Sequence, residues 1–405
     1  MRPQLRFPGF ADAWVEKKLG EIGNTFTSLS GKTADDFGHG NASFITYMNV
    51  YSNPVCDHKM VGQIEIDPRQ NEVKIGDVFF TISSETPEEV GMSSVLKEKC
   101  YMTYLNSFCF GFRPFLTFDL DYLAYVLRSE SVRRKIRILA QGISRYNISK
   151  TKMMEIEIQY PTLPEQHLIG TFFSSLDRLI SLNKQKLSSM KEYKKSMLQR
   201  MFPKAGNLPE LRFPGFSDEW VEKQVKEVAT IVGGNSWKHS DYKNNGDYLV
   251  VTISNVSGDN FINDKIGNRL FCDPDNAYIL NENDILISLT GNVGRVSKMT
   301  AAKGVLNQRV GKVIPNENIV PNFLFYQLNN PRFESTMVYA GQGGAQKNIS
   351  NSDVLSYSIT TPQSKTEQSL IGSFFSNLDR LITLQSQKLS ALDLYKKALL
   401  QRMFC

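Results

Sequence analysis

The chain has 405 residues, of which 41% are hydrophobic and 22% charged, and its formal net charge is +6. This length is enough for two or more domains, each with its own hydrophobic core. No apolar run approaches the roughly 20 residues that a membrane span requires, so we expect no membrane partner, while the mild positive charge permits nucleic-acid binding.

The N-terminal residues, MRPQLRFPGF, lack a basic segment followed by an apolar stretch and a cleavage site, so we expect no secretion signal and a cytoplasmic protein. Leu5–Leu19 (LRFPGFADAWVEKKL) recurs as Leu211–Val225 (LRFPGFSDEWVEKQV). Glu165–Phe202 recurs as Glu367–Phe404, with 26 of 38 aligned positions identical. The chain is therefore two copies of one plan.

The segments between these repeats, roughly 20–160 and 226–361, have nearly the same length but share little sequence. Short apolar runs such as Asp77–Ile82 and Asp284–Leu289 alternate with Gly, Asn, Ser and Asp clusters, which predicts strands and turns. Leu120–Leu139 reads as helical. Weak echoes, such as QGISRYNIS against QGGAQKNIS, indicate that both variable segments share one mixed α/β fold.

A basic cluster lies near the end of the first variable segment. Between Arg128 and Lys152 there are eight Lys or Arg residues and a single acidic residue, Glu130. Such a cluster favours contacts with DNA phosphates, although a solvated helix face would have the same composition.

The C-terminal block of each half has a heptad pattern that predicts a long coiled-coil helix. The first seam consists of Phe173, Leu176, Ile180, Asn183, Leu187, Met190, Lys194, Met197 and Met201, and the second of Phe375, Leu378, Ile382, Gln385, Leu389, Leu392, Lys396, Leu399 and Met403. We expect the two helices to pair antiparallel about a pseudo-twofold axis, with Asn183 and Gln385 fixing the register. The alternative is that each helix is buried separately in its own domain.

A paired helix of this length would act as a spacer. At 1.5 Å per residue, the seam from Phe173 to Met201 spans about 42 Å, and one turn of DNA spans about 34 to 36 Å. The pattern therefore predicts two reading domains held about one helical turn apart on a duplex.

The paired LRFPGF openings, the LDRLI and LQRMF helices and the QG…NIS segments together resemble the specificity subunits of type I restriction-modification systems, over essentially the whole chain. The resemblance implies an α/β fold with two tandem target-recognition domains separated by long antiparallel coiled-coil helices. We expect domains at residues 1–160 and 207–361, with helical spacers at 161–206 and 362–405. It also implies a bipartite double-stranded DNA target, two methyltransferase subunits as partners and, for cleavage, restriction subunits.

The sequence lacks the motifs of the enzymes in such a system. No ExK follows Pro274-Asp275, so a nuclease site is not indicated, and Asn53-Pro54 continues with Val-Cys rather than as the base-gripping NPPY loop of a methyltransferase. Gly31-Lys32-Thr33 resembles the tail of a phosphate-binding loop, but Phe26 stands where its first Gly belongs. We expect a non-catalytic subunit without a cofactor.

We also expect no metal site and no disulfide framework. The cysteines are odd in number and are never spaced as CxxC. Cys56 and His58 lie close together but lack a second pair of ligands. These five thiols are Cys56, Cys100, Cys109, Cys272 and Cys405.

Candidate DNA contacts follow from residue type, because Arg and Lys favour guanine, Asn and Gln favour adenine, and hydroxyls and Lys hold the backbone. In the first domain the candidates are Lys32, Thr33, Ser83, Ser84, Arg113, Gln141, Ser144, Arg145 and Asn147. In the second domain they are Asn235, Lys238, Thr290, Asn292, Arg295, Gln308, Arg309, Gln342, Gln346 and Lys347. For any one of them, a solvated surface role is the alternative.

Two other classes of function remain open at this point. One is a stand-alone bipartite DNA-binding regulator or architectural protein that recruits no enzymes. The other is a coiled-coil scaffold that binds no nucleic acid. A specificity subunit differs from both in forming a stable assembly with a methyltransferase, for which we expect surfaces on the repeated helices and at the openings near Trp14 and Trp220.

Overall fold

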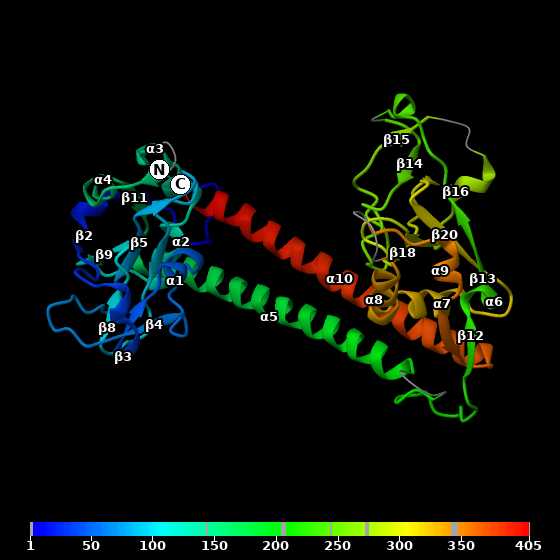
Figure 1. Cartoon of the computed structure of the whole chain (residues 1–405). Helices are drawn as coiled ribbons and strands as arrows, with labels where there is room; N and C mark the ends of the chain where they lie inside the picture. Colours follow the sequence, from blue (N-terminus) through cyan, green and yellow to red (C-terminus); the bar gives the residue numbers. More distant parts are fainter. Residues whose placement is uncertain are drawn as a thin grey trace. The chain divides into compact units, whose positions relative to one another are not determined.

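The structure, a computed structural model, describes residues 3–142, 145–203, 208–243, 245–271, 275–341 and 347–404, apart from the side chains of His239 and Asn276. The chain forms two compact units, Met1–Lys184 with Lys388–Cys405, and Gln185–Gln387. Each unit contains one variable domain and parts of two long helices, α5 (Leu163–Met201) and α10 (Lys365–Met403) (Figure 1). None of the helices in the described part of the chain is long and apolar enough to cross a membrane.

The first domain combines strands with short helices. Its strands are β1 (Val15–Lys18), β2 (Gly23–Phe26), β3 (Phe37–Ile45), β4 (Val61–Ile64), β5 (Val78–Thr81), β6 (Ser83–Ser84), β7 (Ser93–Val95), β8 (Thr103–Leu105), β9 (Cys109–Pro114), β10 (Tyr146–Asn147) and β11 (Glu157–Tyr160). Its helices are α1 (Tyr47–Ser52), α2 (Leu120–Val126), α3 (Glu130–Leu139) and α4 (Lys150–Met154). Among these residues one sheet has the order β2-β9-β5-β7 and another the order β4-β3-β8.

The second domain repeats this arrangement. Its strands are β12 (Val221–Gln224), β13 (Ala229–Gly233), β14 (Tyr248–Val251), β15 (Arg269–Leu270), β16 (Ile279–Leu280), β17 (Ile285–Ser288), β18 (Val296–Lys298), β19 (Gly304–Leu306), β20 (Val310–Pro315) and β21 (Ser358–Thr361). Its helices are α6 (Val225–Val228), α7 (Pro321–Leu328), α8 (Pro331–Ala340) and α9 (Asn351–Leu355). The sheet order β13-β20-β17-β18 matches β2-β9-β5-β7, and β15-β14-β19 matches β4-β3-β8 with β16 as an additional edge strand, which confirms a shared mixed α/β fold.

The stretch Leu120–Leu139, expected as one helical segment, forms two helices. Asp119 caps the first by accepting a hydrogen bond from the backbone of Tyr122, and the chain leaves helical geometry at Ser129, whose extended backbone starts the second. Arg128 lies at this break, and its guanidinium donates to the backbone carbonyls of residues 50, 51, 53 and 93. The break is therefore fixed by contacts that no local pattern reveals.

The repeated openings hold the long helices by an ion pair and a backbone hydrogen bond. Arg6 donates two hydrogen bonds to the buried carboxylate of Glu165 in the first turn of α5, at 2.6 and 2.7 Å. Arg212 does the same to Glu367 of α10, at 2.7 and 2.9 Å. Bidentate pairs of this kind are strong and directional, which accounts for the Arg in both copies of LRFPGF. In the first unit the backbone N–H of Leu5 also donates to the carbonyl of Arg402.

The repeated NIS segment has a structural role in each domain. Asn147 pairs with Ser83 at the start of β6, and Asn348 pairs with Thr290, which follows the end of β17 at Ser288. The following Ile148 is buried in the core, as is its counterpart in the second domain. The serine of each copy accepts a backbone hydrogen bond at the start of α4 or α9, a standard N-cap.

The long helices run in opposite directions within each unit, as the sequence predicts. In the first unit, Phe173 near the start of α5 stacks on Phe404 just after α10, with ring centroids 5.7 Å apart. In the second unit, Phe375 near the start of α10 stacks on Phe202 just after α5, at 5.8 Å. The separate-burial alternative therefore does not hold, because the two helices share each core.

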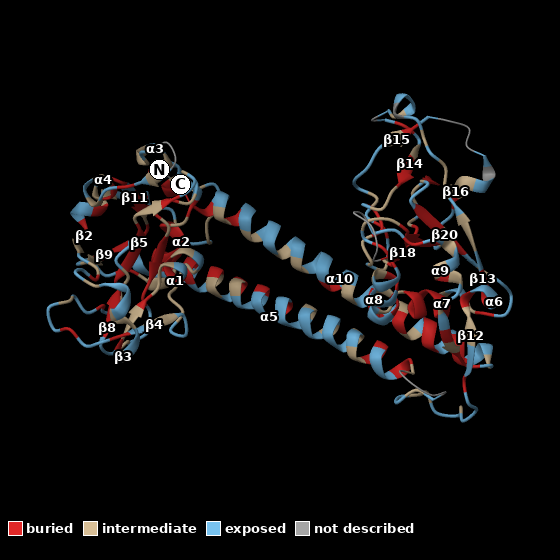
Figure 2. Cartoon of the chain, in the orientation of Figure 1, coloured by how far each residue is buried: buried red, intermediate tan, exposed pale blue. Residues whose placement is uncertain are grey.

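Every residue of the two expected seams is buried or half-buried. In Figure 2, the buried positions of α5 and α10 lie mainly near the helix ends, and the middle sections are mostly exposed or intermediate. Asn183 and Gln385 are 6% and 8% exposed. The Asn183 amide donates to the carbonyl of Leu179 in its own helix, at 2.7 Å.

Candidate nucleic-acid interface

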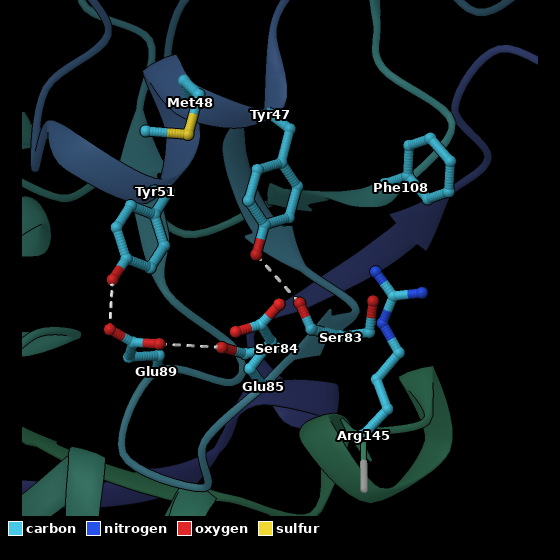
Figure 3. Close-up of a pocket in the computed structure, with 9 residues that line it drawn as sticks. All are labelled: Tyr47, Met48, Tyr51, Ser83, Ser84, Glu85, Glu89, Phe108 and Arg145. Carbon is cyan, nitrogen blue, oxygen red and sulfur yellow. Dashed lines mark hydrogen bonds between the residues drawn. The ribbon is translucent and has the colours of Figure 1, made fainter.

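A pocket of about 370 Å³ opens on the first domain beside β6. Figure 3 shows it enclosed by aromatic side chains, with carboxylates on one side and a guanidinium on the other. Its lining comes from α1, β6, the loop after β6, the turn between β8 and β9, and the segment before β10. The lining residues are Tyr47, Met48, Tyr51, Ser83, Ser84, Glu85, Glu89, Phe108 and Arg145.

Hydrogen bonds hold the acidic side of this pocket. The hydroxyl of Tyr51 donates to Glu89 at 2.6 Å, and the hydroxyl of Ser84 donates to the other oxygen at 3.1 Å. These bonds lower the pKa of Glu89, and the bond with Glu89 raises the pKa of Tyr51. The pocket therefore holds an ionised carboxylate at neutral pH, which would disfavour a phosphate there.

Three of the candidate DNA contacts, Ser83, Ser84 and Arg145, lie together in this pocket. Ser84 is 8% exposed and bonded to Glu89, so Ser83 and Arg145 are the more available of the three. Within the described residues, the exposed guanidinium of Arg145 forms no ion pair. Gln141 and Asn147, both exposed, pair through backbone hydrogen bonds next to the pocket.

Other first-domain candidates have partners inside the protein. Lys32 forms an ion pair with Asp67 at 3.0 Å, and Thr33 caps a short helical turn through Asp36. Arg113 pairs with buried Asp77 at 2.7 Å and lies over the ring of Phe26. These three side chains stabilise loops and the sheet. Residue type alone could not distinguish them from the side chains that line the pocket, because both groups are polar or basic. Ser144 lies outside the described residues.

The second domain brings several of its candidates together through backbone hydrogen bonds. The N–H of Gln308 donates to the carbonyl of Asn235, that of Leu289 to Arg309, and that of Gly291 to Lys347. Thr290 and Asn292 belong to the same short segment. Asn292, Gln308, Arg309 and Lys347 are exposed, and Asn235 and Thr290 are half-buried. This edge corresponds to the pocket region of the first domain.

The remaining candidates of the second domain are not among the residues that these backbone hydrogen bonds bring together. Exposed Lys238 follows the Asn235 segment. Arg295 lies 3.4 Å from the carboxylate of Glu334 and lines a pocket of about 220 Å³ with lysines of α5. Gln342 and Gln346 lie outside the described residues.

The basic cluster at residues 128–152 is only partly available to DNA. Arg133 is 6% exposed and donates to the carbonyls of residues 88, 90 and 91, and Arg128 is similarly bound to the backbone. Burial lowers the pKa of both guanidinium groups to about 10. The expectation that this whole cluster neutralises phosphate is therefore wrong for these two residues, which hold loops of the first domain.

The expectation of a docking surface at Trp14 and Trp220 also requires correction. The two side chains are 4% and 1% exposed. Trp14 packs edge-on against Tyr122 and Phe404, and Trp220 packs against Phe202 in the same way. These tryptophans join each opening to the end of a long helix, so they are core residues.

Sequence reasoning missed Tyr47, Tyr51 and Phe108, which line the pocket. Aromatic residues in a strand-rich segment are usually core, so their type gave no signal. Phe108, however, follows Asn106-Ser107, and such a polar turn between two apolar strands is a place where an aromatic side chain becomes exposed.

The pair Cys56 and His58, considered above as possible metal ligands, has other partners. The thiol of Cys56 shares a hydrogen bond with the hydroxyl of Ser94, and the imidazole of His58 lies within ion-pair distance of Glu98. The described residues contain no cluster of potential metal ligands.

Comparisons with known proteins give a consistent result. The model of the type I restriction modification DNA specificity domain matches residues 11–192 and again 217–394. The putative type I restriction enzyme MjaX specificity subunit of Methanocaldococcus jannaschii is 24% identical over 373 residues, covering 88% of this chain and 85% of that protein. The MjaVIII specificity subunit of the same organism is 25% identical over 295 residues, covering 69% and 68%.

Among solved structures, the type I restriction-modification S subunit from M. genitalium has the same fold, with a TM-score of 0.60 at 15% identity, covering 100% of this chain and 99% of that one. The two family matches coincide with the two halves of the duplication and together span most of the sequence. The chain therefore belongs to the family of type I restriction-modification DNA specificity subunits.

Proposed function

We propose that this chain reads a bipartite double-stranded DNA target, one half-site per variable domain, and directs methyltransferase and restriction subunits to it without a catalytic centre of its own. One observation carries this proposal: the two domains share a fold, yet they present different polar side chains at equivalent surface positions. A duplicated scaffold with different surfaces suits a target made of two dissimilar halves. Such a subunit acts in the cytoplasm, where its DNA is.

The long helices suit the role of spacer. Each has 39 residues, and their antiparallel cores in both units are built from the same repeated side chains. The expected seam of about 42 Å is comparable to one turn of DNA. We therefore propose that the two half-sites are separated by base pairs that the chain does not read.

The repeated helices also suggest where methyltransferase subunits bind. Leu179 and Leu182 of α5 are 42% and 53% exposed, and their counterparts Leu381 and Leu384 of α10 are each 50% exposed. Both pairs stand in sequence that is nearly unchanged between the two halves. Two like apolar surfaces fit two copies of one partner, because contiguous exposed apolar side chains commonly mark protein–protein contacts.

This leucine surface distinguishes the proposal from a stand-alone regulator. The chain should co-purify with two methyltransferase subunits from cells that express both, and light scattering would give the ratio. Changing Leu179, Leu182, Leu381 and Leu384 to Asp should abolish the complex and leave the unfolding transition of the chain in place.

The matched control replaces two exposed polar residues of the same helices, Gln185 and Gln387, with Asp. This control should assemble normally. An intact complex with the four leucines replaced would refute the proposed docking surface, and a native chain that never binds a methyltransferase would favour the stand-alone regulator.

A further inference from the structure

The turn between β8 and β9 in the first domain has the same construction as the turn between β19 and β20 in the second. Each has three residues, Asn106-Ser107-Phe108 and Asn307-Gln308-Arg309. The side-chain oxygen of the Asn accepts a hydrogen bond from the backbone of the third residue, at 2.9 Å for Phe108 and 3.3 Å for Arg309. The two turns therefore present their third side chain from equivalent positions.

The segments beside each turn are also equivalent. In the first domain, Ile82 donates to the carbonyl of Phe108, and Ile148 donates to that of Ile82, both at 3.0 Å. In the second domain, Leu289 donates to the carbonyl of Arg309 at 3.0 Å. Leu289 in turn accepts from the Ile of the second NIS segment, at 2.9 Å. These matched bonds place both turns next to the candidate DNA contacts of their own domain.

The third residue is available for contact in both turns. Phe108 is 60% exposed, although it lines the pocket that contains Arg145. Arg309 is exposed, and its guanidinium forms no ion pair with any described residue. One position thus carries an apolar ring in one domain and a cation in the other.

These two side chains have different chemistry toward DNA. A phenylalanine has no hydrogen-bond donor for a phosphate but contacts the C5 methyl group of thymine in the major groove. The carboxylates of Glu85 and Glu89 line the same pocket and would repel a phosphate (Figure 3). An unpaired arginine forms two hydrogen bonds to O6 and N7 of guanine.

We propose that Phe108 and Arg309 determine specificity at the equivalent position of the two half-sites, Phe108 by contact with a thymine methyl group and Arg309 by bonds to guanine. This inference rests on the proposed function, since it assumes that each domain reads one half-site. It identifies an A·T pair in the first half-site and a G·C pair in the second at the place where these turns meet the DNA.

The test uses the purified complex of the chain with its methyltransferase and a duplex that contains its methylation target. Each thymine of the half-sites is replaced in turn by deoxyuridine, which lacks only the methyl group. One replacement should weaken binding by the native complex about fourfold, which corresponds to the loss of one buried methyl group. The same replacement should have no effect on the Phe108→Ala complex. Phe108→Leu, which keeps an apolar contact, should retain part of the sensitivity.

For Arg309, each guanine is replaced by 7-deazaguanine, which lacks the N7 acceptor. One replacement should weaken binding about tenfold for the native complex and not at all for Arg309→Ala. Lys226→Ala, which removes an exposed cation of α6 that is not among the candidate DNA contacts, serves as the control and should keep the native sensitivity.

If the target is split but no analogue effect depends on Phe108 or Arg309, the inference is overturned and the proposed function stands. If the complex has no split target, both are overturned.

Discussion

The ammonium of Lys194 lies 2.6 Å from the carboxylate of Asp379, which also accepts a hydrogen bond from the hydroxyl of Tyr326 at 2.8 Å. In the first unit, Lys396 and Tyr125 bind Asp177 in the same way. Each group joins the late part of one long helix, the early part of the other and an aromatic residue of the domain. The duplication has thus produced the same polar contact in both units, but with different burial.

Removal of these carboxylates should therefore have unequal effects. Asp379 and Lys194 have side chains that are 6% and 16% exposed, whereas those of Asp177 and Lys396 are 32% and 22% exposed. Asp379→Asn leaves a buried ammonium unpaired and should lower the free energy of unfolding by about 3 kcal/mol. Asp177→Asn should lower it by only about 1 kcal/mol.

Denaturant unfolding of the two variants, alone and combined with Lys194→Met or Lys396→Met, measures both couplings. The combination with Lys194→Met should recover much of the loss caused by Asp379→Asn, because no charge is then left unpaired. Equal losses for the two Asp variants would contradict the account.

The carboxyl of Asp67 should make the first domain sensitive to acid. Arg69 and Lys32 donate to this carboxylate, and these bonds hold its pKa well below the ordinary value. Because folding favours the ionised form, this stabilisation is complete above the unfolded pKa of about 4 and is lost as the pH falls below it. The difference in unfolding midpoint between the native chain and Asp67→Asn should therefore be largest at neutral pH and shrink steadily from about pH 4 downward. A difference that does not change with pH would exclude this role.

Arg145 should contribute to DNA affinity. Its guanidinium is exposed at the pocket and forms no ion pair in the described part of the chain. If it contacts a phosphate, Arg145→Ala should weaken binding to a cognate duplex and reduce the salt slope by about one. If it contacts a base, affinity should fall about 5- to 150-fold with relaxed specificity at one position. Lys18→Ala, which removes an exposed ion pair with Glu155, is the control. Unchanged affinity and salt slope for Arg145→Ala would remove this residue from the interface.

The packing of the long helices should be needed for function. Leu187 and Leu389 are half-buried positions of the expected seams, and Leu389 packs against the core of the first unit. Changing both to Asp places two charges in apolar surroundings and should abolish both assembly and target methylation. If methylation of the target survived this double change, the helices would not be the spacer.

The sequence was sufficient to predict the duplicated plan, because the repeated blocks carry strong helical periodicity and the same buried positions in both copies. It also selected Ser83 and Arg145 as candidate DNA contacts from their residue types, but only the fold shows that they line one pocket. The sequence could not show that Lys32 and Arg113 form ion pairs inside the protein, because their partners Asp67 and Asp77 are more than thirty residues away in the chain. Basic side chains can stabilise loops or contact DNA, and only the fold shows which of these a given residue does.

Burial of charge was the other limit. Arg128 and Arg133 looked like a phosphate-binding cluster, yet both donate to backbone carbonyls of distant loops. Trp14 was likewise expected on a docking surface and lies in a core. The type of a residue carries no information on such long-range contacts. The wrong expectations therefore concern large side chains with polar groups, which can be either exposed or buried.

The most direct test is to map the methylated bases in a genome that carries this subunit together with its methyltransferase. Two reading domains held at a set separation should give one split motif, with two defined half-sites separated by a constant number of unread base pairs, and that motif should be lost when the subunit is deleted. A continuous motif, or a gap that varies from site to site, would contradict the central claim that two reading domains are held at a set separation.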